Sequence, residues 1–95
     1  MKYIKKPIPV EAVKIVNEMH TLDEWDQLLP VWFKNALVTF QLRWTDDGIY
    51  VKSLEGEMFA PWGSYIVKGT EGELYPVRGN IFEKTYEPYE DDVNE

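Results

Sequence analysis

The clearest pattern along the chain is a strict alternation of apolar and polar residues between positions 38 and 45. Val38, Phe40, Leu42 and Trp44 alternate with Thr39, Gln41, Arg43 and Thr45. Successive side chains of a strand point to opposite faces, so this period of two predicts a strand from Leu37. Asp46-Asp47-Gly48 then supplies the residues of a tight hairpin turn, and residues 49–54 should return as the antiparallel partner.

Four more short apolar segments, each bounded by glycine or proline, also predict strands. They cover residues 8–16, 57–60, 64–68 and 73–77. Pro7 and Pro9 lack the amide hydrogen that a sheet ladder needs, so the first segment should begin at a sheet edge or outside the pairing. Together with the hairpin, these segments make about six short strands.

A three- and four-residue period between positions 21 and 36 predicts a helical insertion. Thr21 and Glu24 have the spacing of a capping box, in which each side chain bonds the other residue's amide. Pro30 interrupts the helix, so we expect a stop near position 29. A short second helix should begin with Pro30 in its first turn and carry Trp32 and Phe33.

A C-terminal helical turn is predicted at residues 81–84, where Asn80 can act as the cap and Ile81 and Phe82 would lie on the sheet. Hairpins dominate the rest of the chain. We therefore predict an α+β fold: a mainly antiparallel small β-barrel or roll of about six short strands, with a helical insertion at about 21–36. Residues 1–86 should form one globular domain and residues 87–95 a flexible acidic tail.

Charge separates this tail from the rest of the chain. The 95 residues carry 10 Lys and Arg against 17 Asp and Glu, a net charge of −7. Five of the acidic residues lie in the tail, which leaves 12 acidic against 10 basic residues in positions 1–86. A body so nearly neutral lacks the basic surface that phosphate-backbone binding requires, so we expect no direct nucleic-acid binding. The tail either keeps the protein soluble or docks on a basic partner.

The sequence offers few catalytic groups. Cysteine is absent and His20 is the single histidine, which excludes disulfides, thiolate metal sites, cysteine nucleophiles and any site that needs two histidines. Phosphate-binding loops, dinucleotide fingerprints and nucleophile elbows do not occur. Two pairs of carboxylates lie beside glycine turns: Asp46 with Asp47, and Glu55 with Glu57. Turn formation accounts for the presence of these acidic residues without a bound metal. We therefore expect a protein that is not an enzyme and has no catalytic residues, cofactor or metal.

Aromatic residues make up 15 % of the chain and include four tryptophans. Most must fill the core of so small a domain. Trp62 differs, because it lies in the Pro61-Trp62-Gly63 turn; it is either a lid on the core or a partner contact. The candidate partner-contact residues are Trp62, Tyr65, Tyr89, Glu90, Asp91 and Asp92.

Two stretches of the chain resemble a family of small bacteriophage and prophage proteins. The opening resembles it at Tyr3, Lys6-Pro7-Ile8 and Val10-Glu11-Ala12, and the C-terminal part at Tyr65-Ile66-Val67-Lys68-Gly69, Gly72-Glu73-Leu74-Tyr75-Pro76 and residues 81–87. In that family, and in the related PGDYG-type proteins, a Pro-Gly-Asp-Tyr turn leads into the penultimate strand. Here Pro61-Trp62-Gly63-Ser64-Tyr65 stands in its place, without the aspartate. The resemblance implies a phage or prophage origin and brings no catalytic residues with it.

These observations favour a phage-encoded accessory protein that binds a host or phage protein in the host bacterial cytoplasm. No run of about 18 apolar residues occurs, so we expect no membrane association. The alternative is a small-ligand-binding β-module whose aromatic-lined barrel mouth holds a metabolite or nucleotide. A third hypothesis is an enzyme that works through carboxylates such as Glu57 or Glu73.

Overall fold

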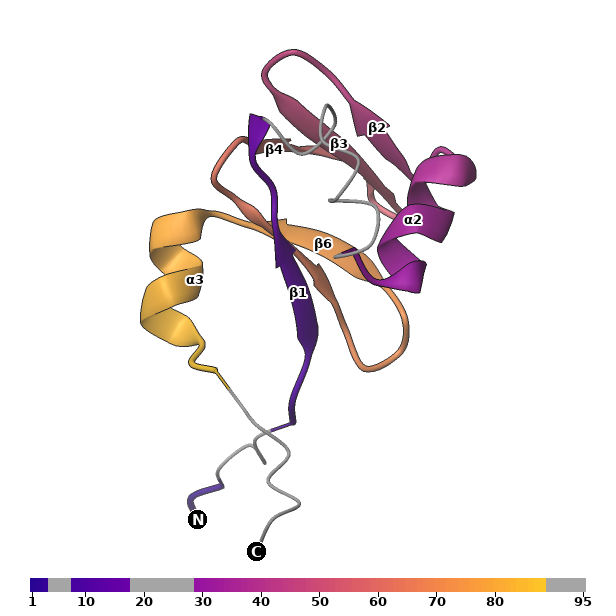
Figure 1. Ribbon diagram of the computed structural model, residues 1–95. Coiled ribbons are helices and arrows are strands. Elements are labelled where there is room, and N and C mark those ends of the chain that lie inside the picture. The colour runs from indigo at the N-terminus through magenta and orange to yellow at the C-terminus, as the bar shows by residue number, and fades with distance from the viewer. Residues whose placement is uncertain (4–7, 18–28, 89–95) are drawn as a thin grey trace, which may run out of the picture.

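The structure is a computed structural model that describes residues 1–3, 8–17 and 29–88 (Figure 1). Along these residues follow β1 (Glu11–Lys14), α2 (Val31–Val38), β2 (Leu42–Trp44), β3 (Gly48–Ser53), β4 (Gly56–Pro61), β5 (Tyr65–Lys68), β6 (Leu74–Val77) and α3 (Gly79–Thr85). Most of the predicted first helix, with its capping box and His20, lies outside the described residues, as does the tail beyond Pro88.

The six strands form two three-stranded sheets, one with the order β1-β5-β6 and one with the order β2-β3-β4. Every pairing within them is antiparallel. The prediction of an antiparallel α+β fold is therefore confirmed. The described strands do not close into a barrel, so the barrel prediction is not confirmed.

Residues 61–64 carry the chain from one sheet into the other. The amide of Trp62 donates to the carbonyl of Asp47 at 3.2 Å, which prolongs the pairing of β3 with β4. One residue later, the amide of Gly63 donates to the carbonyl of Ile15 at 2.8 Å, and the amide of Ile15 donates to Ser64 at 2.9 Å. Gly63 has a φ of +97°, a left-handed conformation that glycine adopts at little steric cost. This corner joins the two sheets.

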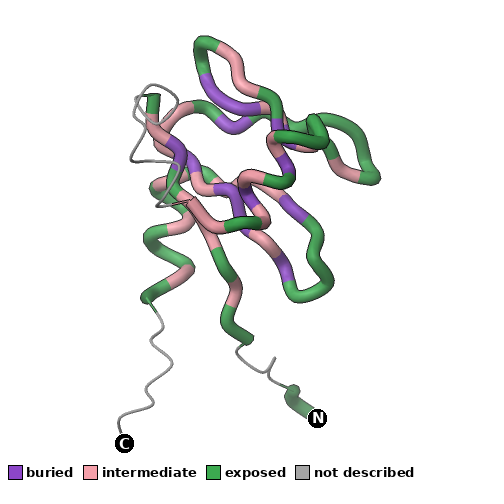
Figure 2. The backbone as a smooth tube through the Cα atoms, turned by 45° about the vertical axis from the view of Figure 1, so that its right-hand side comes forward, coloured by how far each residue is buried: buried purple, intermediate pink, exposed green. Residues whose placement is uncertain are grey.

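The core lies where the two sheets and α2 meet, and the buried segments in Figure 2 belong mainly to strands. Its buried side chains are Ile15, Phe33, Ala36, Leu42, Ile49, Val51, Ala60, Ile66 and Leu74. Ile49 and Val51 stand at alternate positions of β3, and Phe33 and Ala36 stand three apart on α2, as each element's period requires. Burying a side chain of this size contributes about 1.5–3 kcal/mol.

The boundary between α2 and β2 corrects the prediction of a strand from Leu37. Leu37 and Val38 form the last turn of α2, Phe40 takes a φ of +64°, and the strand starts only at Leu42. The alternation misleads because Val38 and Phe40 are 75 % and 74 % exposed and belong to no sheet face. A helix forms here in place of a strand because the helix buries Phe33 and packs Leu37 against the core.

The second helix begins close to the predicted place. Pro30 precedes α2, and its carbonyl accepts hydrogen bonds from the amides of Phe33 at 3.1 Å and Lys34 at 3.2 Å. The predicted C-terminal turn is longer than expected, because α3 starts directly after Arg78 and Asn80 lies inside it. The first predicted strand is shorter, since β1 covers only Glu11–Lys14.

Candidate functional site

The face of the β1-β5-β6 sheet that points away from the core carries α3. Along β5, Ile66 belongs to the core, so its neighbours Tyr65 and Val67 lie on the opposite face. The register places Ala12 beside Val67 and Lys14 beside Tyr65 on that same face. A small side chain at Ala12 leaves room between the sheet and the helix.

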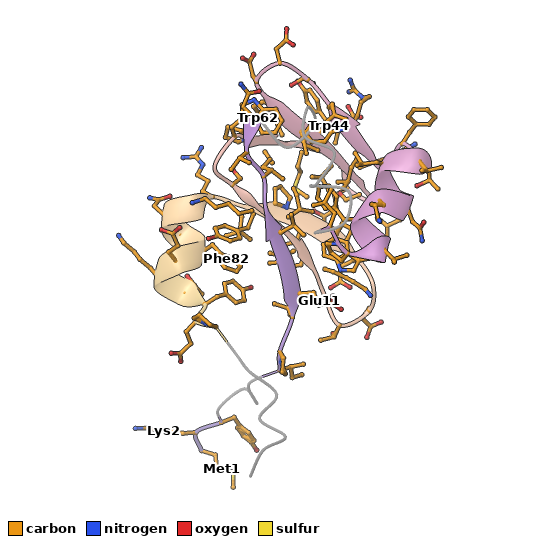
Figure 3. All side chains as sticks on the ribbon, viewed as in Figure 1. Met1, Lys2, Glu11, Trp44, Trp62 and Phe82 are labelled. Carbon is orange, nitrogen blue, oxygen red and sulfur yellow. The ribbon has the colours of Figure 1, made fainter. Side chains whose placement is uncertain are left out.

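Three aromatic rings stack between this face and α3. The ring centroids of Tyr65 and Phe82 lie 3.8 Å apart with an interplanar angle of 13°, and those of Phe82 and Tyr86 lie 4.6 Å apart at 18°. Figure 3 shows Phe82 pointing from α3 toward the sheet. Phe82 thus lies on the sheet as predicted, whereas Ile81 remains 50 % exposed. We call these three residues the aromatic stack.

A groove of about 1010 Å³ opens beside the aromatic stack. Its lining comes from both ends of the described chain: Ile8, Pro9, Val10 and Ala12 from the start, Tyr65 from β5, and Phe82, Glu83, Thr85, Tyr86, Glu87 and Pro88 from α3 and the residues after it. Most of these side chains are apolar or aromatic. The volume is at the top of the range of about 300–1,000 Å³ that is typical of small-ligand sites.

Carboxylates supply the charge of the groove. Glu83 Oε2 accepts a hydrogen bond from the hydroxyl of Tyr65 at 3.3 Å and lies 3.7 Å from Lys14 Nζ. The side chains of Lys14 and Glu83 are 49 % and 57 % exposed, so this ion pair contributes little stability. Its effect is to orient Glu83 and to hold Lys14 Nζ 5.9 Å from the centre of the Tyr65 ring.

Tyr75 anchors the end of the aromatic stack. Its burial, which is the largest cause, raises its pKa together with the hydrogen bond to Tyr86 and the charges of Tyr86 and Glu73, from 10.0 to about 12. The hydroxyl of Tyr75 is therefore neutral at physiological pH. It acts as a hydrogen-bonding partner of Tyr86.

The sequence prediction found one residue of the groove and missed the others. Tyr65 lines the groove, whereas Tyr89, Glu90, Asp91 and Asp92 lie outside the described residues. The sequence predicts Phe82 only as a residue that lies on the sheet, and it does not single out Tyr86 as a contact. Their spacing of four residues was the available signal, because residues four apart share one face of a helix.

Trp62 lies at the corner of the fold, away from the groove. Its indole Nε1 donates to the carbonyl of Asp46 at 2.8 Å, and its ring lies 5.5 Å from the ring of Trp44 (Figure 3). It packs, partly buried, against the core. This is the geometry of a lid on the core. A partner contact by Trp62 stays a prediction.

A second exposed surface lies on the outer face of the β2-β3-β4 sheet. Arg43 Nη2 lies 3.2 Å from Glu57 Oε1 and its guanidinium 4.7 Å from the ring centre of Tyr50, which packs at 5.0 Å on Phe59. These side chains contact one another, and none of them lines the groove. We therefore regard this surface as a reference face for experiments on the groove.

The rest of the described structure contains no further candidate for a catalytic or metal site. A smaller hollow of about 300 Å³ lies near Trp32, whose indole Nε1 donates to Glu11 Oε1 at 3.0 Å. Within residues 1–3, 8–17 and 29–88, no three histidine, cysteine or acidic side chains come together as metal ligands. The same residues contain no helix long and apolar enough to cross a membrane.

Comparison with known proteins gives this chain no relative: no family model matches it, no curated protein is significantly similar, and no solved structure matches its fold. The resemblance to small phage proteins stays a prediction.

Proposed function

We propose that this protein is a binding protein without enzymatic activity, and that it holds a segment of another protein in the groove between α3 and the residues that lead into β1. The observation that carries the proposal is the apolar lining of a groove of about 1010 Å³ on a chain of 95 residues. The resemblance to phage proteins supports an accessory role in a phage or prophage, with a host or phage protein as the partner in the bacterial cytoplasm.

The composition of the groove favours a protein segment as the ligand. A domain this small needs most of its large apolar residues for its core, and apolar surface left in one continuous groove is typical of an interaction site. Tyrosine and phenylalanine are also among the side chains that contribute most to protein interfaces.

The length of the groove is compatible with an extended peptide. One wall runs from Ile8 to Ala12. At about 3.3 Å per extended residue, these four steps cover roughly 13 Å, enough to contact about four residues of an extended ligand. A segment of that length can bury several side chains against the aromatic stack.

A small planar ligand is the second candidate. The parallel arrangement of the aromatic stack is the specific observation in its favour, because a flat ring adds to such a stack with good contact. The groove is also large enough to hold a large metabolite or a nucleotide. The sequence analysis offered a small-ligand site lined by aromatic residues at a barrel mouth. In this second candidate the ligand is of the same kind, and the aromatic-lined site is the groove.

Site-specific photo-crosslinking in the bacterial host tests the proposal. A benzoylphenylalanine at Val10 lies in the groove wall, and one at Lys52 lies on the reference face. We expect a discrete protein adduct from position 10 and none from position 52. Ala12→Trp should abolish that adduct, because the larger side chain fills the groove from the sheet side.

The same variants separate the two candidates. Identical adducts from positions 10 and 52, or an adduct that persists in Ala12→Trp, would contradict protein binding in the groove. If the low-molecular-mass fraction of a host extract raises the melting temperature of the wild type and leaves that of Ala12→Trp unchanged, the small-ligand candidate is supported instead.

A further inference from the structure

The charged residues of the groove indicate which kind of segment fits it. We infer that the groove binds a cationic segment of a partner protein, in which apolar side chains stand beside lysine or arginine. The inference rests on the proposed function, since it concerns the same groove. It adds the chemistry of the ligand.

The charged lining of the groove has one sign. Glu83 and Glu87 are its only charged residues among those the structure describes, and both are acidic. The side chain of Glu83 is 57 % exposed, so a ligand can still approach its carboxylate. Glu87 follows α3 and is exposed. A cation that enters the groove therefore meets two carboxylates.

Lys14 shows how a cation binds at this place. Its ammonium group contacts the Glu83 carboxylate at 3.7 Å and lies 5.9 Å from the centre of the Tyr65 ring. Both the carboxylate and the ring face attract a positive charge. A lysine or arginine of the partner can repeat this arrangement, with its aliphatic stem on the aromatic stack and its charged end at Glu87.

The net charge of the chain argues against the other possible occupants. At −7, two copies of this protein repel each other, and an acidic partner is repelled as well. A neutral apolar segment would fill the groove without pairing Glu87, whereas Glu83 already has Lys14 as its counter-ion. Charge complementarity therefore selects a basic, apolar segment.

A random peptide library displayed on yeast tests the inference. We expect the peptides enriched by the wild-type protein to combine apolar residues with lysine or arginine. Glu87→Lys should bind these peptides roughly three- to tenfold more weakly, as expected when one exposed attraction becomes a repulsion. The matched control is Glu55→Lys, which makes the same change of net charge in the β3–β4 turn and should alter affinity less than about twofold.

The outcomes separate this inference from the proposed function. Enrichment of neutral or acidic peptides that still depend on the groove, or an equal loss in Glu55→Lys, would overturn the cationic ligand and leave peptide binding in place. A failure to enrich any peptide, or enriched peptides that bind Ala12→Trp as well as the wild type, would overturn both. Circular dichroism of each variant confirms that it folds before it is compared.

Discussion

Replacing Trp62 with alanine should destabilise the whole fold, because this side chain closes the corner at which the two sheets meet. Its ring packs 5.5 Å from Trp44, its indole donates to Asp46 at 2.8 Å, and its backbone amide donates to Asp47 at 3.2 Å. The first two contacts disappear in Trp62→Ala, and the backbone hydrogen bond to Asp47 in the β2–β3 turn remains.

The size of the effect follows from these contacts. Truncating a fully buried tryptophan costs about 3–5 kcal/mol. Trp62 is only partly buried, so we take about 2 kcal/mol for lost packing and about 1 kcal/mol for the hydrogen bond to Asp46. A loss of about 3 kcal/mol in a domain of this size lowers the melting temperature by roughly 12–24 °C. Trp62→Phe keeps most of the packing and should lose only about 1 kcal/mol.

Urea denaturation followed by far-ultraviolet circular dichroism measures both variants without relying on tryptophan fluorescence. The expected order of the free energy of unfolding is wild type, then Trp62→Phe, then Trp62→Ala. If Trp62→Ala shifts the free energy of unfolding by less than about 0.5 kcal/mol, the corner does not depend on this side chain. The interpretation of Trp62 as a lid would then be wrong.

Three further changes test the fold and the aromatic stack. Gly48→Ala should lower the free energy of unfolding by more than about 2 kcal/mol in urea denaturation, because a Cβ there would overlap the carbonyl oxygen of Ala60. Gly56→Ala is the control: nothing lies within 4 Å of its Cβ, so it should cost about 1 kcal/mol for its left-handed φ alone. Phe33→Ala should cost about 3–5 kcal/mol by the same assay, since the ring is fully buried. Tyr75 has a pKa raised to about 12, so its contribution to stability is fully present below pH 10 and is lost as the pH rises toward 12. Ultraviolet titration of tyrosinate in Tyr86→Phe should show the pKa of Tyr75 moving back toward 10, because the hydrogen bond with Tyr86 is lost.

The hairpins could be predicted because their turns are built from neighbouring residues. Thr45 Oγ1 accepts hydrogen bonds from the amides of Asp47 and Gly48, both at 3.1 Å, and donates to the Gly48 carbonyl at 2.9 Å. Ser53 makes the equivalent bonds at the next turn, donating to the carbonyl of Gly56 at 2.9 Å. The prediction used the glycines of these two turns, and β3 and β4 have nearly their predicted bounds.

The end of α2 could not be predicted from local pattern. The alternation across Val38 and Phe40 is a property of exposed side chains, whereas the helix is fixed by the burial of Phe33 against strands distant in the sequence. Short apolar runs fit a helix and a strand equally well until the packing partner is known.

The groove also could not be predicted from the sequence alone. Its walls, Val10 and Tyr86, come from opposite ends of the described chain. They meet because β1 pairs with β5 in one register, and a shift of β1 by a single residue would place Ala12 and Tyr65 on opposite faces of the sheet. Tyr65 was predicted as a contact residue, but its partners depend on that register.

Nuclear magnetic resonance titration with a peptide enriched from the library tests the central claim most directly. The account predicts shifts in the backbone amides of Ile8, Val10 and Phe82, while the indole signals of Trp44 and Trp62 stay in place, because these rings lie outside the groove. Shifts confined to β2, β3 and β4, or at the indole of Trp62 without any at Phe82, would show that binding occurs elsewhere and would contradict the account.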